Sequence, residues 1–322
     1  IAEIRSAISL FTAAYNNVPV VSRMVDIMED DSYLEPEPAG PERSVDMSAM
    51  SELRFSGVSY EYNKDSPVLK DIDMTFAKGG LYAIVGLSGS GKTTALEVLS
   101  GMRMPQMGMI EIDNEPVTAE TLRSFRSQVG YGSQNPIMFQ DTIYKNIGYG
   151  LTDPPLKALE KAARGAGIHS FISQLPDGYD TELGVGGASI SGGQKQRISL
   201  ARVLAGLPQV ILLDEITSAL DVNSEAHIMQ TLKQLARDRI LVLATHRLYC
   251  LRNFDWIYVL HEGKLVESGT HDDLCRMDKG LYASLYNLQV QAVDGGETLA
   301  EPSAKQSTME AAHDEPLRID VK

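Results

Sequence analysis

The sequence lacks the features that are typical of disulfide-stabilised or membrane-spanning chains. Only two of its 322 residues are cysteines, Cys250 and Cys275, which suits a reducing compartment and leaves no cysteine spacing for a metal site. No apolar run approaches the roughly 20 residues that a helix needs to cross a bilayer, and no segment resembles a signal peptide. The length permits one large domain or two ordinary ones.

A basic stripe is also missing. The net charge is −14, of which residues 26–46 carry −7 and residues 291–322 carry −4. Charge runs of this kind usually keep a segment solvated, so we expect an acidic linker, a disordered acidic tail and a weakly acidic core between them. Because that core has no basic stripe, we expect no nucleic-acid partner.

Residues 1–46 are predicted to lie outside the main domain. Apolar residues recur at steps of three and four from Ile1 to Met28, as in an amphipathic helix that Pro19 kinks or breaks. Such a helix would either cover the domain or dock on a second chain or domain, and the pattern does not decide between them. Residues 31–41 are acidic and proline-rich, which favours a linker. We therefore place the main domain at residues 47–290.

The strongest local pattern is Gly-Leu-Ser-Gly-Ser-Gly-Lys-Thr at residues 86–93, which fits the phosphate-binding loop G-x-x-x-x-G-K-[ST]. An apolar strand candidate at 81–85 precedes it and a helix candidate at 94–99 follows, as this motif requires. Glycines let the backbone wrap around an anion, so that N–H groups and the helix N-terminus point at phosphate oxygens. The alternative is a glycine-rich turn before an ordinary helix, but strand, spacing, lysine and threonine all favour a nucleoside triphosphate site.

Within this loop, Lys92 is expected to reach the outer phosphates as a point charge, and the Thr93 hydroxyl is expected to bind Mg²⁺. The residues predicted to contact ATP here are Gly86, Ser88, Gly89, Ser90, Gly91, Lys92, Thr93 and Thr94.

Other apolar patterns predict an α/β fold. Further strands are expected at 53–62, 68–76 (one strand or two), 109–114, 129–134, 210–215, 240–246, 256–260 and 263–269. The alternation at 53–62 favours an antiparallel β segment that leads into the phosphate-loop strand. The continuous apolar runs at 210–213 and 240–244 instead indicate strands buried on both faces. Residues 152–179 predict a compact helical insertion, and a further helix is expected at 198–205.

Polar residues end two of these buried strands. Asp214 and Glu215 follow one run, and His246 follows another. Triphosphate hydrolysis needs Mg²⁺ ligands and a group that activates water, so Asp214 is expected near the metal and Glu215 near the attacking water. Each signal is weak alone, and the upstream phosphate loop strengthens it.

The segment Ser191-Gly192-Gly193-Gln194 resembles the signature motif of the ATP-binding cassette (ABC) family. The resemblance covers roughly residues 53–288 and implies a P-loop NTPase core, an antiparallel β subdomain and a helical subdomain that carries the signature. Tyr62 matches the aromatic residue that stacks on adenine, although Tyr60 is close enough to be a rival.

The same resemblance assigns the remaining catalytic positions. Gln134 matches the glutamine that lies near Mg²⁺ and the transport domain, and His246 matches the histidine that contacts the γ-phosphate. Asp221, in Ser218-Ala219-Leu220-Asp221, matches the D-loop aspartate. The implied catalytic set is therefore Glu215, His246, Lys92 and Gln134, and the implied metal ligands are Thr93, Gln134 and Asp214.

The family further implies a head-to-tail dimer, either homodimeric or heterodimeric. ATP and Mg²⁺ would lie between the phosphate loop of one cassette and Ser191, Gly192, Gly193 and Gln194 of the other. ATP binding would close the dimer and hydrolysis would reopen it.

Two segments resemble exporters in particular. Residues 135–147 resemble the segment after the glutamine loop, and residues 23–28 resemble the helix that joins the last membrane span to the cassette. We therefore expect a transmembrane domain upstream of Ile1 and a location at the cytoplasmic face of the cell membrane. Val185 and Gly186 replace the Glu-Arg pair that is usual in exporters, which affects the expected coupling rather than the ATP chemistry.

Two alternatives compete with an exporter ATPase. An ABC ATPase of DNA repair or translation would show a basic face, a coiled-coil insertion or a second cassette, and none is evident. A weakly hydrolysing half of a heterodimer commonly loses the residues that correspond to Glu215 or His246, and both are present here.

Overall fold

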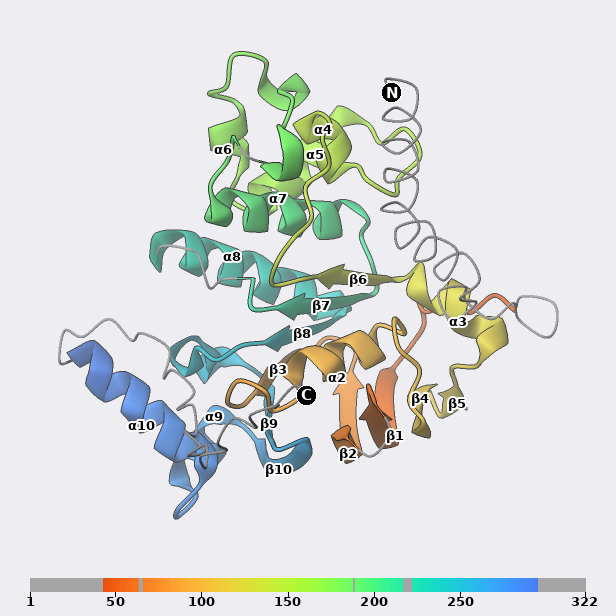
Figure 1. The fold of residues 1–322 in the computed structure, drawn as a ribbon, viewed down its shortest axis with the longest axis vertical. Helices are drawn as coiled ribbons and strands as arrows, with labels where there is room; N and C mark the ends of the chain where they lie inside the picture. The colour runs from red at the N-terminus through yellow and green to blue at the C-terminus, as the bar shows by residue number, and fades with distance from the viewer. Residues whose placement is uncertain (1–42, 64–65, 188, 217–221, 295–322) are drawn as a thin grey trace, which may run out of the picture.

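The computed structural model describes residues 43–63, 66–187, 189–216 and 222–294 of the chain (Figure 1). The predicted helix over residues 1–28, the linker at 31–41, the D-loop residue Asp221 and the tail from 295 onward lie outside the described residues.

A six-stranded sheet in the order β10-β9-β3-β8-β7-β6 forms the centre of the molecule. Its strands are β3 (Leu81–Val85), β6 (Val129–Gly132), β7 (Val210–Asp214), β8 (Ile240–Ala244), β9 (Trp256–His261) and β10 (Lys264–Gly269). All neighbouring pairs are parallel except β9 and β10. Every residue of β3, β7 and β8 is buried, as their continuous apolar runs predict.

A second sheet is antiparallel, with the order β2-β1-β4-β5. Its strands are β1 (Glu52–Glu61), β2 (Pro67–Ala77), β4 (Met107–Ile112) and β5 (Glu115–Pro116). Alternating residues of β1, such as Leu53 and Phe55, are buried because successive side chains point to opposite faces of a sheet. The predicted antiparallel β subdomain is therefore confirmed, and the segment 68–76 lies within a single strand.

Helix α2 (Lys92–Leu99) packs between the two sheets (Figure 1). Its apolar residues, including Leu96 and Leu99, share one core cluster with Phe55 of the antiparallel sheet and Ile84 of the central sheet. Helix α2 begins two residues before the predicted helix. Packing on both sides fixes the helix N-terminus, and with it the phosphate loop, relative to the central strands.

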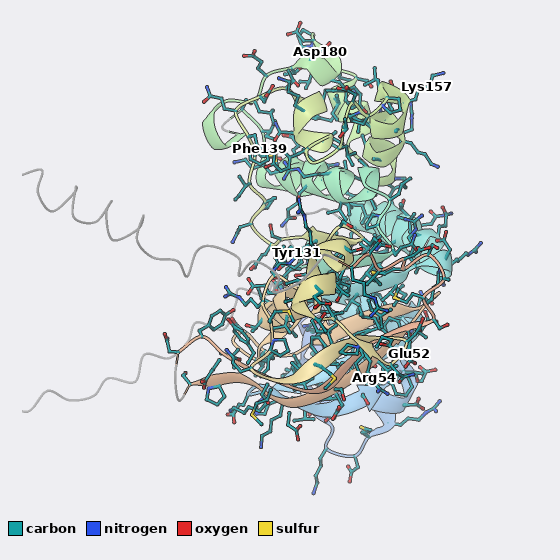
Figure 2. The ribbon with its side chains drawn as sticks, turned by 90° about the vertical axis from the view of Figure 1, so that its right-hand side faces the viewer. Glu52, Arg54, Tyr131, Phe139, Lys157 and Asp180 are labelled. Atoms are coloured by element: carbon teal, nitrogen blue, oxygen red, sulfur yellow. The ribbon has the colours of Figure 1, made fainter. Side chains whose placement is uncertain are left out.

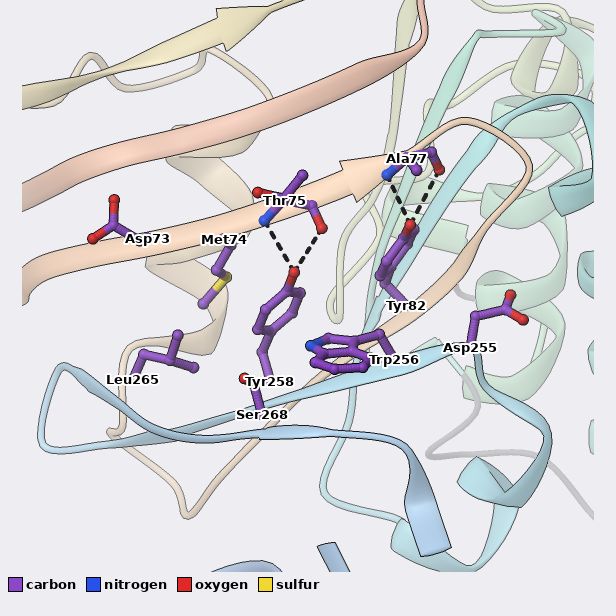
Figure 3. A pocket seen from close by; sticks show the side chains of 10 residues that line it. All are labelled: Asp73, Met74, Thr75, Ala77, Tyr82, Asp255, Trp256, Tyr258, Leu265 and Ser268. Atoms are coloured by element: carbon purple, nitrogen blue, oxygen red, sulfur yellow. Dashed lines mark hydrogen bonds between the residues drawn. The ribbon is translucent and has the colours of Figure 1, made fainter. Parts of the chain in front are cut away.

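Two tyrosines of the central sheet also bind the edge of β2 (Figure 3). The hydroxyl of Tyr258 accepts from the Thr75 N–H at 2.9 Å and donates to the Thr75 carbonyl at 2.6 Å. The hydroxyl of Tyr82 pairs in the same way with Ala77, at 2.7 and 3.2 Å. These bonds satisfy backbone groups that an edge strand would otherwise leave open. They form the wall of a groove of about 510 Å³ beside Trp256.

The helical subdomain lies on the opposite side of the central sheet from the antiparallel sheet (Figures 1 and 2). Its elements are α4 (Ile143–Ile147), α5 (Leu156–Gly165), α6 (His169–Ile172), η2 (Gly178–Asp180), η3 (Val185–Gly187) and α7 (Gly192–Ala205). Figure 2 shows Lys157 and Asp180 at its outer end, far from Glu52 and Arg54 on β1. Its core is shared with the central sheet through residues such as Val85 and Leu213.

The remaining helices complete the fold. They are α3 (Ala119–Arg126), α8 (Val222–Leu235), η4 (Ala236–Asp238), η5 (Leu248–Asn253), α9 (His271–Arg276) and α10 (Leu281–Asp294). Within the described ranges, no helix combines the length and the apolar character that a membrane span requires.

One predicted helix boundary is wrong. Helix α7 begins at Gly192 rather than Ile198, because Ser191 and Gln194 form a capping box that starts the helix inside the polar signature segment. Helix α10 runs to Asp294, four residues past the residue at which we place the end of the main domain.

Candidate nucleotide-binding and catalytic site

The predicted catalytic residues follow the carboxyl ends of four neighbouring parallel strands. The phosphate loop follows β3, Asp214 ends β7, His246 follows β8 and Gln134 follows β6. In open α/β sheets, ligands bind outside this edge. The topology therefore brings together residues that are far apart in the sequence, such as Thr93 and Asp214, which are 121 positions apart.

The phosphate loop needs glycine at defined positions. A Cβ at Gly86 would lie 2.2 Å from the Leu260 carbonyl oxygen, and Gly91 has φ 103°, a conformation that L side chains rarely adopt. Gly91 is the N-cap of α2 and supplies no side-chain acceptor to the first N–H groups of the helix. Ser90 is buried, and its hydroxyl has no hydrogen-bond partner among the described residues. Uncapped donors and an unpaired buried hydroxyl suit the oxygens of a bound phosphate.

Lys92 is folded back over this loop. Its Nζ donates to the carbonyl oxygens of Gly86 at 2.9 Å and Leu87 at 3.1 Å, and the residue is 7% exposed. Burial lowers the pKa of Lys92, although the carboxylates of Glu215 and Asp214 oppose the shift. The loop thus holds a buried cation where the predicted phosphates would lie.

Thr93 and Asp214, two of the three predicted metal ligands, lie in contact. The Thr93 hydroxyl donates to Oδ2 of Asp214 at 2.8 Å. Asp214 is 2% exposed, and burial raises the pKa of its carboxyl despite this bond. A hydroxyl and a carboxylate are hard oxygen ligands that suit Mg²⁺, which usually takes one or two carboxylates together with substrate phosphates. The part of the chain that the structure describes holds no cluster of three or more His, Cys, Asp or Glu residues fit for a metal.

Glu215 is held between two other predicted catalytic side chains. Its Oε2 accepts from Gln134 Nε2 at 2.8 Å, and its Oε1 lies 3.0 Å from His246 Nδ1. The His246 bond is the main cause that lowers the pKa of Glu215, with burial opposing it. The carboxylate is therefore ionised near neutral pH and can accept a proton. Glu215 has φ 48°, an uncommon backbone angle that is typical of functional positions.

The two tyrosines proposed for adenine differ in exposure. Tyr60 is 9% exposed and belongs to the core, whereas Tyr62 is 48% exposed. The Tyr62 hydroxyl lies 3.0 Å from Thr94 Oγ1 and donates to Glu97 at 3.1 Å, so its ring lies beside α2. The Arg103 guanidinium lies 4.6 Å from the centre of this ring.

The signature segment lies at the surface of the helical subdomain, with Ser191 and Gly192 exposed and Gly193 and Gln194 half-buried. Ser191 Oγ accepts from the Gln194 N–H at 3.3 Å, and Gln194 Oε1 accepts from the Ser191 N–H at 2.8 Å. No atom lies within 4 Å of a Cβ built on Gly192. Among the residues that the structure describes, no hydrogen bond joins this segment to the phosphate loop of the same chain.

Some residues at the site were not predicted from the sequence. Gln289 of α10 bonds to the backbone on both sides of Arg247, directly after His246. Glu225 of α8 accepts from Arg247 at 3.3 Å and from the Tyr249 hydroxyl at 3.0 Å. These are long-range contacts without a local sequence signal.

Residues 69–218 match the family model described as ABC transporter. The chain belongs to the ABC transporter family. The predicted family and fold class are confirmed.

Curated proteins and a solved structure are similar to this ABC domain over most of its length. The heavy metal tolerance protein of Schizosaccharomyces pombe is 36% identical over 90% of this chain and 35% of its own length. An ATP-dependent lipid A-core flippase of Chromohalobacter salexigens is 40% identical over 75% of this chain and 42% of its own length. The solved structure of a bacterial Atm1-family ABC exporter with ATP bound has a TM-score of 0.76 and 35% identity, covering 87% of this chain and 49% of the exporter chain. The chain thus spans less than half the length of these relatives.

Proposed function

We propose that this ABC domain hydrolyses Mg²⁺-ATP to drive export, with Glu215 as the general base. The observation that carries this proposal is the placement of the Glu215 carboxylate between Gln134, at 2.8 Å, and His246, at 3.0 Å. This carboxylate follows Asp214, whose side chain is bonded to Thr93 of the phosphate loop. A base, a metal pair and a phosphate cradle at one sheet edge are the parts that phosphoryl transfer to water needs.

Each residue has a defined task in this reaction. Lys92 and the α2 N-terminus bind the outer phosphates, and the exposed ring of Tyr62 stacks on the adenine. Glu215 takes a proton from the attacking water while the oxygen of that water bonds to the γ-phosphorus. The bond from that phosphorus to the bridging oxygen then breaks, which yields ADP and inorganic phosphate. His246 orients Glu215 and contacts the γ-phosphate.

Thr93, Asp214 and Gln134 would hold Mg²⁺, which when bound neutralises charge on the phosphates. The donor set supports this assignment, because hydroxyl, carboxylate and amide oxygens are all hard ligands. The 2.8 Å bond between Thr93 and Asp214 already positions two of these groups against each other.

We further propose that the site is completed by a second cassette. Of the signature residues, Ser191 and Gly192 are exposed and Gly193 and Gln194 are half-buried, and none makes a hydrogen bond to the described phosphate loop of its own chain. In a head-to-tail dimer, the start of α7 would add N–H groups and a hydroxyl to the phosphates bound by the partner. The solved exporter that this chain resembles has ATP bound, which supports ATP as the ligand of the proposed site.

The proposed membrane partner would dock on the helical subdomain. Ile137 is 72% exposed and Tyr149 is 60% exposed, so this subdomain presents large apolar side chains on its surface. Arg202 ties both together: its guanidinium donates to the Ile137 carbonyl at 3.1 Å and lies 5.9 Å from the centre of the Tyr149 ring. A transmembrane domain in contact here would place the chain at the cytoplasmic face of a membrane. The names of the relatives point to different cargoes, so the substrate is not part of the proposal.

The substitution Glu215→Gln tests this function. The variant should still bind ATP and accumulate a closed dimer, while its turnover falls by about 100-fold or more because the base is lost. Dimer mass is measured by light scattering with and without ATP, and phosphate release is measured in parallel. Turnover at the parental rate would show that Glu215 is not the base, and a monomer in saturating ATP would contradict the composite site.

A further inference from the structure

The segment that carries His246 is held from outside the catalytic edge. Gln289 of α10 bridges two backbone groups of this segment. Its Oε1 accepts from the Leu248 N–H at 2.8 Å, and its Nε2 donates to the His246 carbonyl oxygen. One amide therefore closes over the chain on both sides of Arg247, at a sequence distance of 43 residues from His246.

Helix α10 is firmly anchored at its other end. The carboxylate of Glu267 on β10 accepts from the N–H groups of Leu281 and Tyr282, the latter at 3.0 Å. Tyr282 is fully buried, and its hydroxyl lies 2.8 Å from His271 Nδ1. Because Gln289 follows Tyr282 by seven residues, two helical turns place both on one face of α10. Figure 1 shows α10 at the edge of the molecule beside α9.

The next residue, Arg247, is held by Thr245 and Glu225, whereas His246 itself lies at an exposed part of the catalytic edge. The residue lies beyond the end of β8, and its side chain is 47% exposed. Its Nδ1 nevertheless lies 3.0 Å from Glu215 Oε1. Gln289 bonds to the backbone carbonyl of this half-exposed residue and so restrains where its side chain lies relative to Glu215.

We infer that Gln289 is a positioning residue for His246, through which the C-terminal helix α10 sets the rate of ATP hydrolysis. This inference rests on the proposed role of His246 in hydrolysis. Gln289 has no place in the phosphate loop, so its removal should lower kcat and leave nucleotide binding unchanged.

The test uses Gln289→Leu in the full 322-residue chain, because leucine keeps a similar volume and removes both hydrogen bonds. We expect kcat to fall by about tenfold, since small displacements of a catalytic group have effects of this size or more. The KM for ATP should change much less than kcat, because the contacts proposed for Lys92, Thr93 and Tyr62 with ATP are intact. Gln291→Leu is the matched control, since Gln291 is an exposed glutamine on the same helix, and it should keep parental kcat.

Coupling to His246 is tested by a double-mutant cycle. If Gln289 acts through His246, Gln289→Leu should have no further effect on kcat in a His246→Ala background. An equal loss of kcat in both backgrounds would overturn the inference, as would parental kcat in the single variant.

A second measurement is independent of activity. Hydrogen exchange at the Leu248 amide should accelerate in Gln289→Leu and remain slow in Gln291→Leu, because only the first variant removes its acceptor. Unchanged exchange would overturn the inference even if the chain hydrolysed no ATP. Faster exchange in a chain without ATPase activity would instead contradict the proposed function and leave the Gln289 contact established.

Discussion

Two helix N-termini in this chain are each proposed to contact the phosphates of an ATP molecule, but they differ in how their N–H groups are capped. The start of α2 has a glycine N-cap in a left-handed conformation and no side-chain cap. The start of α7 has a complete capping box, in which Ser191 and Gln194 satisfy each other's N–H groups. The first end is buried around Lys92, and the second is exposed.

This difference in capping suggests different roles: the start of α2 binds the phosphates of its own chain's ATP, and the start of α7 adds contacts to ATP bound by another chain. At α2, the uncapped donors, the unpaired Ser90 hydroxyl and the buried Lys92 ammonium all cost stability until an anion binds. At α7, the helix is stable without a ligand and its open glycine leaves room for a phosphate carried by another chain. The first end should therefore dominate affinity, and the second should dominate turnover in the dimer.

The largest expected effect comes from disabling the two ends in separate chains. Lys92→Ala should lose nucleotide affinity and hydrolysis together. Gly192→Asp should fold, because an acid in the first helical turn is favourable and a Cβ has open space there, yet it should repel the phosphates. A mixture of the two inactive variants should recover about one quarter of parental turnover, because half of the dimers contain one intact composite site.

The mixture is assayed for phosphate release at several ratios of the two chains, with each variant alone as the control. Activity that never exceeds the average of the separate variants would show that the two helix ends do not share one site.

The next effect concerns glycine at each end. Gly91→Ala forces alanine to φ 103° with its Cβ 3.0 Å from Leu69 and 3.1 Å from the Val68 carbonyl oxygen. We expect a loss of about 1–3 kcal/mol in the free energy of unfolding, together with loss of nucleotide binding. Gly192→Ala meets no atom, and alanine favours helix, so its stability should rise by up to about 1 kcal/mol. Urea unfolding of both variants decides this, and equal destabilisation would contradict the comparison.

Much of this site could be predicted from local patterns. The strand ends that carry Asp214, Glu215 and His246 follow continuous apolar runs, and parallel strands bring such ends to one edge. The start of α7 was predicted too late because the polar residues after Ser191 show no apolar periodicity. The S-x-x-Q capping box was the signal that would have corrected it.

Other features depend on tertiary structure and have no local signal. Tyr60 and Tyr62 are two residues apart, so the sequence pattern places both rings on the same face of the predicted strand. Strand β1 ends at Glu61, and the ring of Tyr60 is buried whereas that of Tyr62 is exposed. Gln289 reaches His246 across 43 residues, and although its spacing from Tyr282 places it on the packed face of α10, nothing in the sequence pattern identifies its partner. Such contacts are set by how helices pack, which residue patterns do not determine.

The smallest expected effect is on the free energy of unfolding without nucleotide, which should change in opposite directions when the start of α2 or the start of α7 is altered. Lys92→Met should raise the free energy of unfolding, since it removes a buried charge whose pKa is lowered by burial. Ser191→Ala should lower it by about 1 kcal/mol, as expected for loss of an N-cap. Both are measured by urea unfolding of the nucleotide-free chain.

The pH dependence of these two differences provides the control. The folded-state pKa of Lys92 lies below its ordinary value of 10.5, so the folded chain binds this proton less tightly than the unfolded chain. The cost of the charge is fully present below the folded-state pKa and disappears as pH rises from that value toward 10.5. The advantage of Lys92→Met should therefore shrink over this window, whereas the deficit of Ser191→Ala should not, because the Ser191 hydroxyl bonds to the uncharged Gln194 N–H. If Lys92→Met were less stable than the parental chain at neutral pH, the hydrogen bonds from Lys92 to Gly86 and Leu87 would outweigh the cost of burying its charge. The start of α2 would then be stable without a bound anion, as the start of α7 is.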